Sequence, residues 1–92
     1  MPLSFGWDRA KARVNRTKHG VNFEEAVTVF ADPLSLTVPD EAHARVREDR
    51  FATIGVSNRG RLLVVIHSDV GDAVRIISAR RATRREKRDY EE

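Results

Sequence analysis

The spacing of hydrophobic positions predicts helices in the first third of the chain. Residues 9–19, "RAKARVNRTKH", follow Asp8, a residue type that caps helix N-termini, and precede Gly20, the type preferred just past a helix C-terminus. The apolar positions of this segment form only a thin stripe, Ala10, Val14 and Thr17. We therefore expect a surface helix with a mostly cationic circumference.

A second helical pattern covers residues 22–32, "NFEEAVTVFAD". Asn22 is suited to cap it, and Glu25 stands three residues later, as in an imperfect capping box. The apolar residues recur at the spacing of a buried helical stripe, namely Phe23, Ala26, Val27 and Phe30. Pro33 is expected to end this helix.

The middle of the chain has the patterns of strands. Residues 34–39, "LSLTVP", alternate in polarity, and Pro39 confines this strand to an edge or ends it. After a polar loop, three β-like runs follow that are joined by short hairpin-like segments: residues 51–57, 61–68 and 73–79. Residues 62–66, "LLVVI", are apolar on both faces and are expected to form the central strand.

A last helix is predicted at the C-terminus. Residues 83–86, "TRRE", form a capping box in which Thr83 is the cap and Glu86 reaches back. Since Ala82 and Tyr90 are almost its only apolar positions, either Tyr90 docks this helix or it frays until a partner binds. The chain is thus expected to be one α+β domain over residues 1–92. Its sheet would be an antiparallel meander of three to four strands, packed with two N-terminal helices and a short C-terminal helix.

The length and composition of the chain indicate a small protein with a single domain. Ninety-two residues suit a single domain, and 40% hydrophobic residues suffice for a core. No apolar run approaches the roughly 20 residues of a membrane-spanning helix, and the N-terminus lacks the pattern of a secretory signal. The absence of cysteine excludes disulfides, thiol catalysis and cysteine zinc sites. We expect a cytoplasmic protein with no membrane partner.

Charge is distributed unevenly along the chain. Residues 1–20 contain five Lys/Arg and one acid, residues 21–74 contain five and nine, and residues 75–92 contain seven and four. If the two basic ends meet in the fold, they form a cationic patch suited to phosphate. Two solvated helix faces would explain the same charges.

The sequence has no motif for a bound phosphate cofactor or dinucleotide, and its three histidines share no ligand spacing. We therefore expect no metal and no cofactor. Proton transfer and phosphate-ester cleavage remain as possible chemistry. RNA cleavage needs only a base for the 2′-hydroxyl proton, an acid for the leaving oxygen, and cations for the charge on the phosphate.

Arginines provide the candidate cations. Arg75 lies inside an apolar strand pattern, which is uncommon for a charged residue unless it is paired, snorkelled or facing a site. Further arginines, whose guanidinium forks match phosphate oxygens, follow towards the C-terminus: Arg80, Arg81, Arg84 and Arg85.

The candidate proton-transfer groups are His19, Lys18, Glu48, His67 and Tyr90. Most of them also have a structural explanation: a partner of helix-end carbonyls for His19, a hydrogen-bonded core residue for His67, a loop charge for Glu48 and a helix anchor for Tyr90.

Three stretches together resemble the BrnT family of type II toxin-antitoxin toxins: "FGWDRAKARVNRTKHGVNFEEA", "FATIGVSNRGRLLVVIHSD" and "RIISARRATRREKRDYE". The most specific pieces are Trp7-Asp8 with Lys11 and Asn15, the Lys18-His19-Gly20 triplet with Phe23, the Gly60-Arg61 turn, and "RIISAR" with Tyr90-Glu91. This resemblance implies a fold like that of RelE-type toxins and a ribonuclease activity that inhibits translation. It also implies neutralisation by a BrnA-like antitoxin with a ribbon-helix-helix part, and contact with DNA only through that complex.

The resemblance carries over to Lys18 and His19 and to Arg75, Arg80 and Tyr90, which match its motifs. Two segments depart from the family pattern. Gly6 stands where the family commonly has an acid before Trp-Asp, and residues 40–50 are less like its usual "E-x-R" segment. The resemblance therefore gives little support for roles of Glu48 and Arg50.

The expected mechanism is metal-independent RNA cleavage. Arg75 and Arg80 would hold the scissile phosphate, with His19 or Glu48 as base and Tyr90 or His67 as acid. Flanking phosphates would be bound by the remaining cations, Lys11, Lys18, Arg81, Arg84 and Arg85. The alternative is a non-catalytic module that binds RNA, the ribosome or an acidic antitoxin surface. A DNA-binding regulator is less favoured, because the first two helices lack a helix-turn-helix turn.

Overall fold

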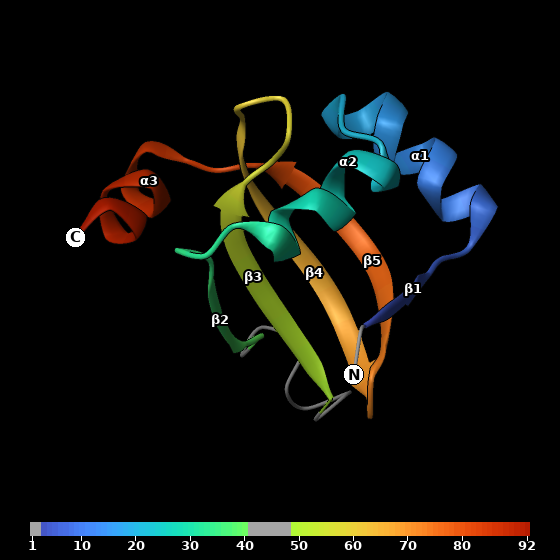
Figure 1. Cartoon of the computed structure of the whole chain (residues 1–92). Coiled ribbons are helices and arrows are strands. Elements are labelled where there is room, and N and C mark those ends of the chain that lie inside the picture. The colour runs from blue at the N-terminus through green and yellow to red at the C-terminus, as the bar shows by residue number, and fades with distance from the viewer. Residues whose placement is uncertain (1–2, 41–48) are drawn as a thin grey trace.

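The computed structural model describes residues 3–40 and 49–92 and shows an α+β fold built on a curved five-stranded sheet (Figure 1). The strands, in the spatial order β1-β5-β4-β3-β2, are β1 (Ser4–Gly6), β2 (Leu36–Pro39), β3 (Arg50–Val56), β4 (Leu62–Val70) and β5 (Ala73–Arg81). The helices are α1 (Arg9–His19), α2 (Phe23–Thr28), the 3-10 helix η1 (Val29–Ala31) and α3 (Arg84–Glu91).

The prediction of a purely antiparallel sheet of three to four strands is wrong in one respect. The strands β2 to β5 do form an antiparallel meander with β4 at the centre, as predicted, and β2 with its Pro39 lies at an edge. A fifth strand, β1, pairs in parallel with β5, with Phe5 opposite Val74. Three residues are too few for a periodic signal, so only the contact with β5 makes this segment a strand.

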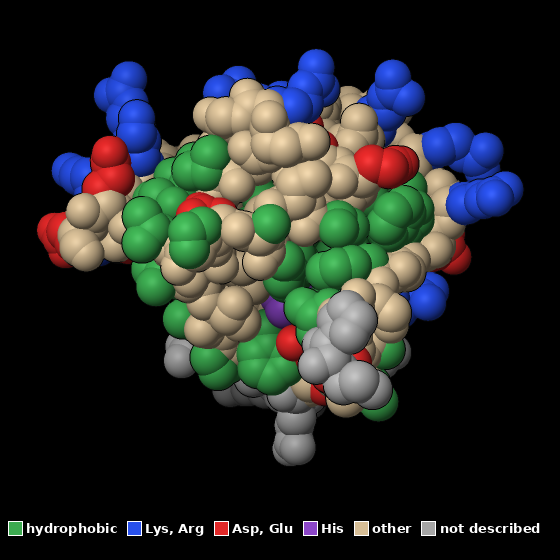
Figure 2. All heavy atoms as spheres, in the orientation of Figure 1, with side chains coloured by type: hydrophobic (Ala, Val, Ile, Leu, Met, Phe, Trp, Pro, Cys, Tyr) green, Lys and Arg blue, Asp and Glu red, His purple; other side chains and the backbone are tan. Residues whose placement is uncertain are grey.

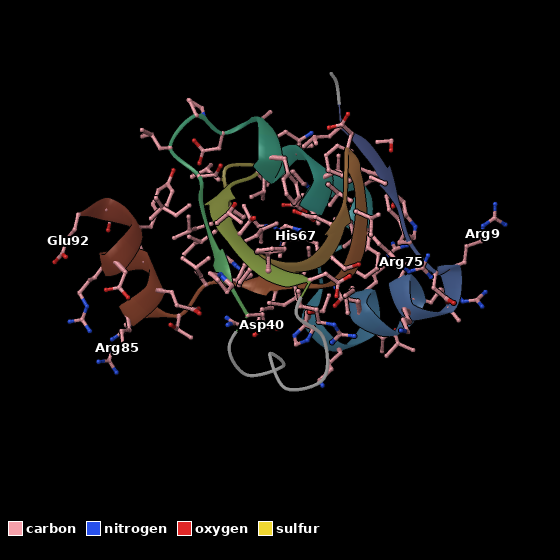
Figure 3. The ribbon with its side chains drawn as sticks, turned by 90° about the horizontal axis from the view of Figure 1, so that it is seen from below. Arg9, Asp40, His67, Arg75, Arg85 and Glu92 are labelled. Carbon is pink, nitrogen blue, oxygen red and sulfur yellow. The ribbon has the colours of Figure 1, made fainter. Side chains whose placement is uncertain are left out.

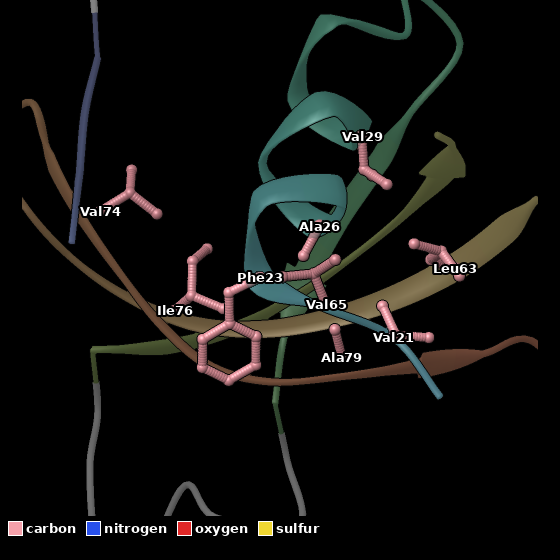
Figure 4. Packing of buried hydrophobic residues seen from close by; sticks show 9 residues of the cluster. All are labelled: Val21, Phe23, Ala26, Val29, Leu63, Val65, Val74, Ile76 and Ala79. Atoms are coloured by element: carbon pink, nitrogen blue, oxygen red, sulfur yellow. The ribbon is translucent and has the colours of Figure 1, made fainter. Parts of the chain in front are cut away.

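One face of the sheet is covered by α2 and η1, and the hydrophobic core lies between these helices and the sheet (Figure 4). Phe23 and Ala26 are fully buried there, and Val27 and Phe30 are partly buried against the same cluster. The predicted stripe is confirmed, although the α-helix is short and continues as the 3-10 turn η1 before Pro33.

The predicted ends of α1 are confirmed, but its predicted inward face is wrong. Asp8 Oδ1 accepts hydrogen bonds from the amides of Ala10 (2.8 Å) and Lys11 (3.1 Å), and Gly20 has a left-handed φ of 70°. Val14, expected in the apolar stripe, has 65% of its surface exposed. Asn15 is buried instead and is held by hydrogen bonds of its side-chain amide, while Ala12 on the same inward face packs against the core.

The terminal helix α3 has the predicted capping box, in which Thr83 Oγ1 accepts from the Glu86 amide (3.2 Å) and Glu86 Oε1 accepts from the Thr83 amide (2.8 Å). Tyr90 docks it, since its hydroxyl donates to Asp32 Oδ2 at 2.5 Å. The helices α1 and α3 stand at opposite ends of the sheet, as the labelled Arg9 and Arg85 show (Figure 3). The two basic ends of the chain therefore flank the sheet and do not form a single patch.

Candidate nucleic-acid interface

The arginines of the strands lie on the sheet face opposite α2, called the far face below. Residues directly opposite each other in paired strands share a face. Arg75 is opposite Ser68, and Arg80 is opposite Val64. Along β4 these two positions alternate with the core residues Leu63, Val65 and His67, so both arginines project away from α2.

A β-bulge brings the two arginines to the same face. Residues five apart in a regular strand point to opposite faces. In β5, Ser78 pairs with Ile66 but the next paired residue, Ile76, is opposite His67, so Ile77 is an extra residue in the ladder. The apolar pair Ile76-Ile77 gives no sequence signal for a bulge, and the prediction of a regular strand missed it.

Arg75 and Arg80 nevertheless do not lie side by side. Their partners on β4 are four residues apart, which corresponds to about 13 Å along a strand. Arg80 donates from Nη1 and Nη2 to the two carboxylate oxygens of Glu86, each at 2.8 Å. This pair raises the pKa of Arg80 and lowers that of Glu86 to about 2. Arg75 is exposed and lies near the beginning of α1 (Figure 3), so it is the more accessible cation.

The helix α1 borders the far face along β5. A cavity of about 320 Å³ lies between them and is lined by residues of both, including Lys11, Lys18, His19, Ile77 and Ser78. The structure thus brings the Lys18-His19 motif next to the strand that carries Arg75 and Arg80. Among the proton-transfer candidates predicted from the sequence, His19 is the histidine that borders this face.

His67 lies on the other face, in the core, with 1% of its surface exposed (Figure 3). Its Nε2 is 2.7 Å from Thr53 Oγ1, and its Nδ1 is 2.6 Å from Asp69 Oδ1. The ring packs edge-on against Phe30 and is stacked on Phe51. The structure therefore does not bring His67 together with the arginines of the far face.

The hydroxyl of Tyr90 is engaged elsewhere. Its hydrogen bond to Asp32 raises the pKa of Tyr90 and lowers that of Asp32, whose carboxylate also accepts from the amides of Val56 (2.8 Å) and Leu34 (2.9 Å). This contact fixes α3 to the turn after η1. Glu48, the predicted alternative base, lies outside the described residues.

The remaining predicted RNA-binding arginines surround the α3 end of the sheet. Arg81 is opposite Leu63, and therefore on the α2 side, while Arg84 and Arg85 are exposed in the first turn of α3. On the α2 side of the molecule, Lys and Arg side chains stand at the margins of a central apolar region (Figure 2). The far face differs because arginines arise from its central strands.

A buried charged cluster that the sequence interpretation did not predict holds α2 to the β3–β4 turn. The Glu25 carboxylate accepts from Ser57 Oγ (2.7 Å) and from both Nε (2.9 Å) and Nη2 of Arg61. Arg61 Nη2 also donates to the Gly20 carbonyl at 3.2 Å. The hydrogen bond from Arg61 is the main reason that the pKa of Glu25 is lowered. Glu25 therefore supports the fold and does not complete a helix cap, although Asn22 does cap α2 (2.7 Å).

Within residues 3–40 and 49–92, no three His, Asp or Glu side chains are grouped closely enough to hold a metal ion. In the same ranges no helix has the length and apolar character needed to cross a membrane.

Comparison with known proteins identifies the family. A search of curated protein sequences found no match. Among solved structures, the chain is similar to the crystal structure of the Brucella abortus ribonuclease toxin BrnT, with a TM-score of 0.68 and 27% sequence identity over 89% of this chain and 99% of that one. Residues 7–86 match the model of the family described as the ribonuclease toxin BrnT of type II toxin-antitoxin systems. The chain therefore belongs to the BrnT family of toxins, and this membership implies a protein antitoxin as its partner and RNA as its substrate.

Proposed function

We propose that this toxin is an endoribonuclease that cleaves RNA on the far face without a metal ion and thereby inhibits translation in the cytoplasm. The observation that supports this proposal best is the bulge at Ile77, which places Arg75 and Arg80 on one face between two basic helices. Guanidinium groups on a preorganised surface stabilise the charge that develops on a phosphate during cleavage.

The proposed reaction is an internal transfer. The 2′-oxygen attacks the adjacent phosphorus atom and the bond to the 5′-oxygen breaks, giving a 2′,3′-cyclic phosphate and a free 5′-hydroxyl. A base accepts the 2′-hydroxyl proton, and an acid supplies a proton to the leaving 5′-oxygen. Since nucleophile and leaving group both belong to the RNA, proton transfer and charge stabilisation suffice.

Arg75 and Arg80 take the phosphate-binding roles because both lie on the far face. Arg75 binds the scissile phosphate and Arg80 a neighbouring one, with His19 or Glu48 as base. The acid is Tyr90 once its hydroxyl has left Asp32, because His67, the other predicted acid, is enclosed in the core. Flanking phosphates are bound by the cations at the two ends of the sheet: Lys11, Lys18, Arg81, Arg84 and Arg85.

The test is cleavage of RNA by purified toxin, free of antitoxin and treated with a chelator. We expect products with 2′,3′-cyclic phosphate ends, and expect Arg75→Ala and Arg80→Ala to be inactive while remaining folded by circular dichroism. Arg59→Ala, at the exposed β3–β4 turn, is the matched control and should cleave normally. Normal cleavage by Arg80→Ala would remove Arg80 from the mechanism. Bound but intact RNA would favour the non-catalytic module.

We also propose that the antitoxin is BrnA-like, with a ribbon-helix-helix part that alone contacts DNA. Its docking would cover α3, which is attached mainly through Glu86 and Tyr90. The protein encoded next to the toxin should co-purify with it and abolish RNA cleavage. Cleavage that persists in a stable complex would contradict this arrangement.

A further inference from the structure

Four residues form a row across four strands of the far face, near the β1 end of the sheet. Gly6 is opposite Arg75, Arg75 is opposite Ser68, and Ser68 is opposite Arg50. Because cross-strand partners share a face, the side chain of Ser68, which is 9% exposed, projects between those of Arg50 and Arg75. These residues belong to four different strands, and only the strand register brings them together.

The spacing of the row suits one phosphate group. Neighbouring strands lie about 4.8 Å apart, so the Cα atoms of Arg50 and Arg75 are about 10 Å apart, with Ser68 midway between them. Both long side chains can reach a group placed above Ser68. A guanidinium fork matches two oxygens of a phosphate, and a hydroxyl can donate to a third.

The two arginines of the row also have free hydrogen-bonding capacity. Arg80 and Arg61 are occupied by Glu86 and Glu25, respectively. By contrast, within residues 3–40 and 49–92 Arg75 has no carboxylate within ion-pair distance, and Arg50 Nε is a buried donor without a hydrogen-bond partner. A buried donor without a partner is unfavourable, and a phosphate oxygen would satisfy it once the Arg50 side chain turns outwards.

A groove leads to this row. It has a volume of about 490 Å³, and its lining includes Gly6, Asp49, Ser68 and Arg75. A side chain at Gly6 would meet no atom within 4 Å, so the space beside Arg75 is open. Arg75 and Asp49 line the groove itself, and Arg50, which is paired with Ser68, adds a second guanidinium group next to it. With this second cation the row carries more positive than negative charge, which favours an anion.

We propose that Arg50, Ser68 and Arg75 together hold the scissile phosphate of the RNA. This inference rests on the proposed ribonuclease function and deepens it, because it adds two residues that the sequence interpretation did not assign. It also separates the roles of the strand arginines, since Arg80 lies about 13 Å away from Arg75 and serves a neighbouring phosphate.

The experiment compares cleavage by Arg50→Lys, Arg75→Lys and Ser68→Ala, all checked for folding by circular dichroism. Lysine keeps the charge and the alkyl stem but lacks the fork. We expect each lysine variant to lose roughly 100-fold in cleavage rate, and Ser68→Ala roughly tenfold. The double lysine variant should be scarcely slower than either single one, because groups that act on one phosphate as a unit are not additive. The control, Arg59→Lys, should cleave like the wild type.

Normal cleavage by Arg50→Lys, or fully additive losses in the double variant, would overturn the proposal while leaving the ribonuclease function intact. A phosphate site without ribonuclease activity can be recognised by a second measurement. The protein is titrated with inorganic phosphate, and the Nε–H signals of the arginine side chains are followed by NMR. If the wild type cleaves no RNA but phosphate shifts the signals of both Arg50 and Arg75, the site stands and the proposed function falls. If phosphate shifts neither signal, the site falls.

Discussion

The side-chain amide of Asn15 pairs with the backbone of Ala79 as a neighbouring β-strand would. Asn15 Nδ2 donates to the Ala79 carbonyl at 2.8 Å, and the Ala79 amide donates to Asn15 Oδ1 at 3.1 Å. The strand β1 covers the edge of β5 only from Ala73 to Arg75. Helix α1 therefore covers the part of the β5 edge that β1 leaves unpaired. The two hydrogen bonds to Ala79 also fix the position of α1 beside the far face.

Replacing Asn15 should destabilise the protein strongly. Asn15→Ala removes the two hydrogen bonds to Ala79 and a third to the Val21 carbonyl (3.0 Å), and leaves buried polar groups without partners. We expect the free energy of unfolding to fall by about 2–4 kcal/mol, measured by urea denaturation. Val14→Ala, one residue away and exposed, is the control and should change it little. Equal stability of both variants would mean that α1 is held by other contacts.

Gly55 should tolerate no side chain. A Cβ there would lie 2.9 Å from Val29 Cγ1 and 3.0 Å from Ser35 Cβ, because η1 and the following turn approach β3 at this position. Gly55→Ala is expected to lower the free energy of unfolding by about 1–3 kcal/mol through overpacking. Gly6→Ala meets no neighbouring atom and should be nearly neutral when the two variants are compared by urea denaturation. A neutral Gly55→Ala would show that η1 can move away at little cost.

His67 is expected to matter for stability and not for cleavage. His67→Gln disturbs the buried contacts with Thr53 and Asp69 and should lower the free energy of unfolding by about 2–4 kcal/mol. RNA cleavage per folded molecule should remain at the wild-type rate, because the ring faces the core. A loss beyond about tenfold in a folded variant would restore His67 as a candidate acid.

The ion pair of Glu86 makes stability depend on pH in acid. Its pKa is lowered from the ordinary value of 4.5 to about 2, mainly by the hydrogen bond from Arg80, so the unfolded state binds the proton more readily than the folded state. The stabilisation is present above the unfolded pKa and is lost as the pH falls from about 5 towards 2. Glu25 acts in the same direction. Urea denaturation from pH 7 to pH 2 should show a smaller decline for Glu86→Gln than for the wild type. If the free energy of unfolding declines equally with pH in the two proteins, the ion pair of Glu86 is not the cause of the acid sensitivity.

Tyr90 should control the attachment of α3. Tyr90→Phe removes only the hydroxyl that donates to Asp32, so the sheet should stay intact while α3 opens more often. Hydrogen exchange is expected to accelerate at the amides of Arg84–Glu91 and to stay unchanged in β4. If the α3 amides exchange at the wild-type rate, the pair of Arg80 and Glu86 alone suffices to hold the helix.

Local structure and family membership could both be predicted from the amino-acid sequence. The caps at Asp8, Asn22 and Thr83, the order of the strands β2 to β5 and the central position of β4 follow from interactions between residues close in the chain or from plain hydrophobic patterns. The motifs that resemble the BrnT family are equally local, and the family match over residues 7–86 confirms that interpretation.

Which residues share a surface depends on the three-dimensional fold and could not be predicted from the sequence. The bulge at Ile77 sets Arg75 and Arg80 on the far face, the same register buries His67 on the other, and the row from Arg50 to Arg75 exists only through strand pairing. Shifting a strand by one residue exchanges its two faces. That register is fixed by the simultaneous packing of strands and helices remote in the chain, which a periodic pattern of hydrophobic residues cannot specify.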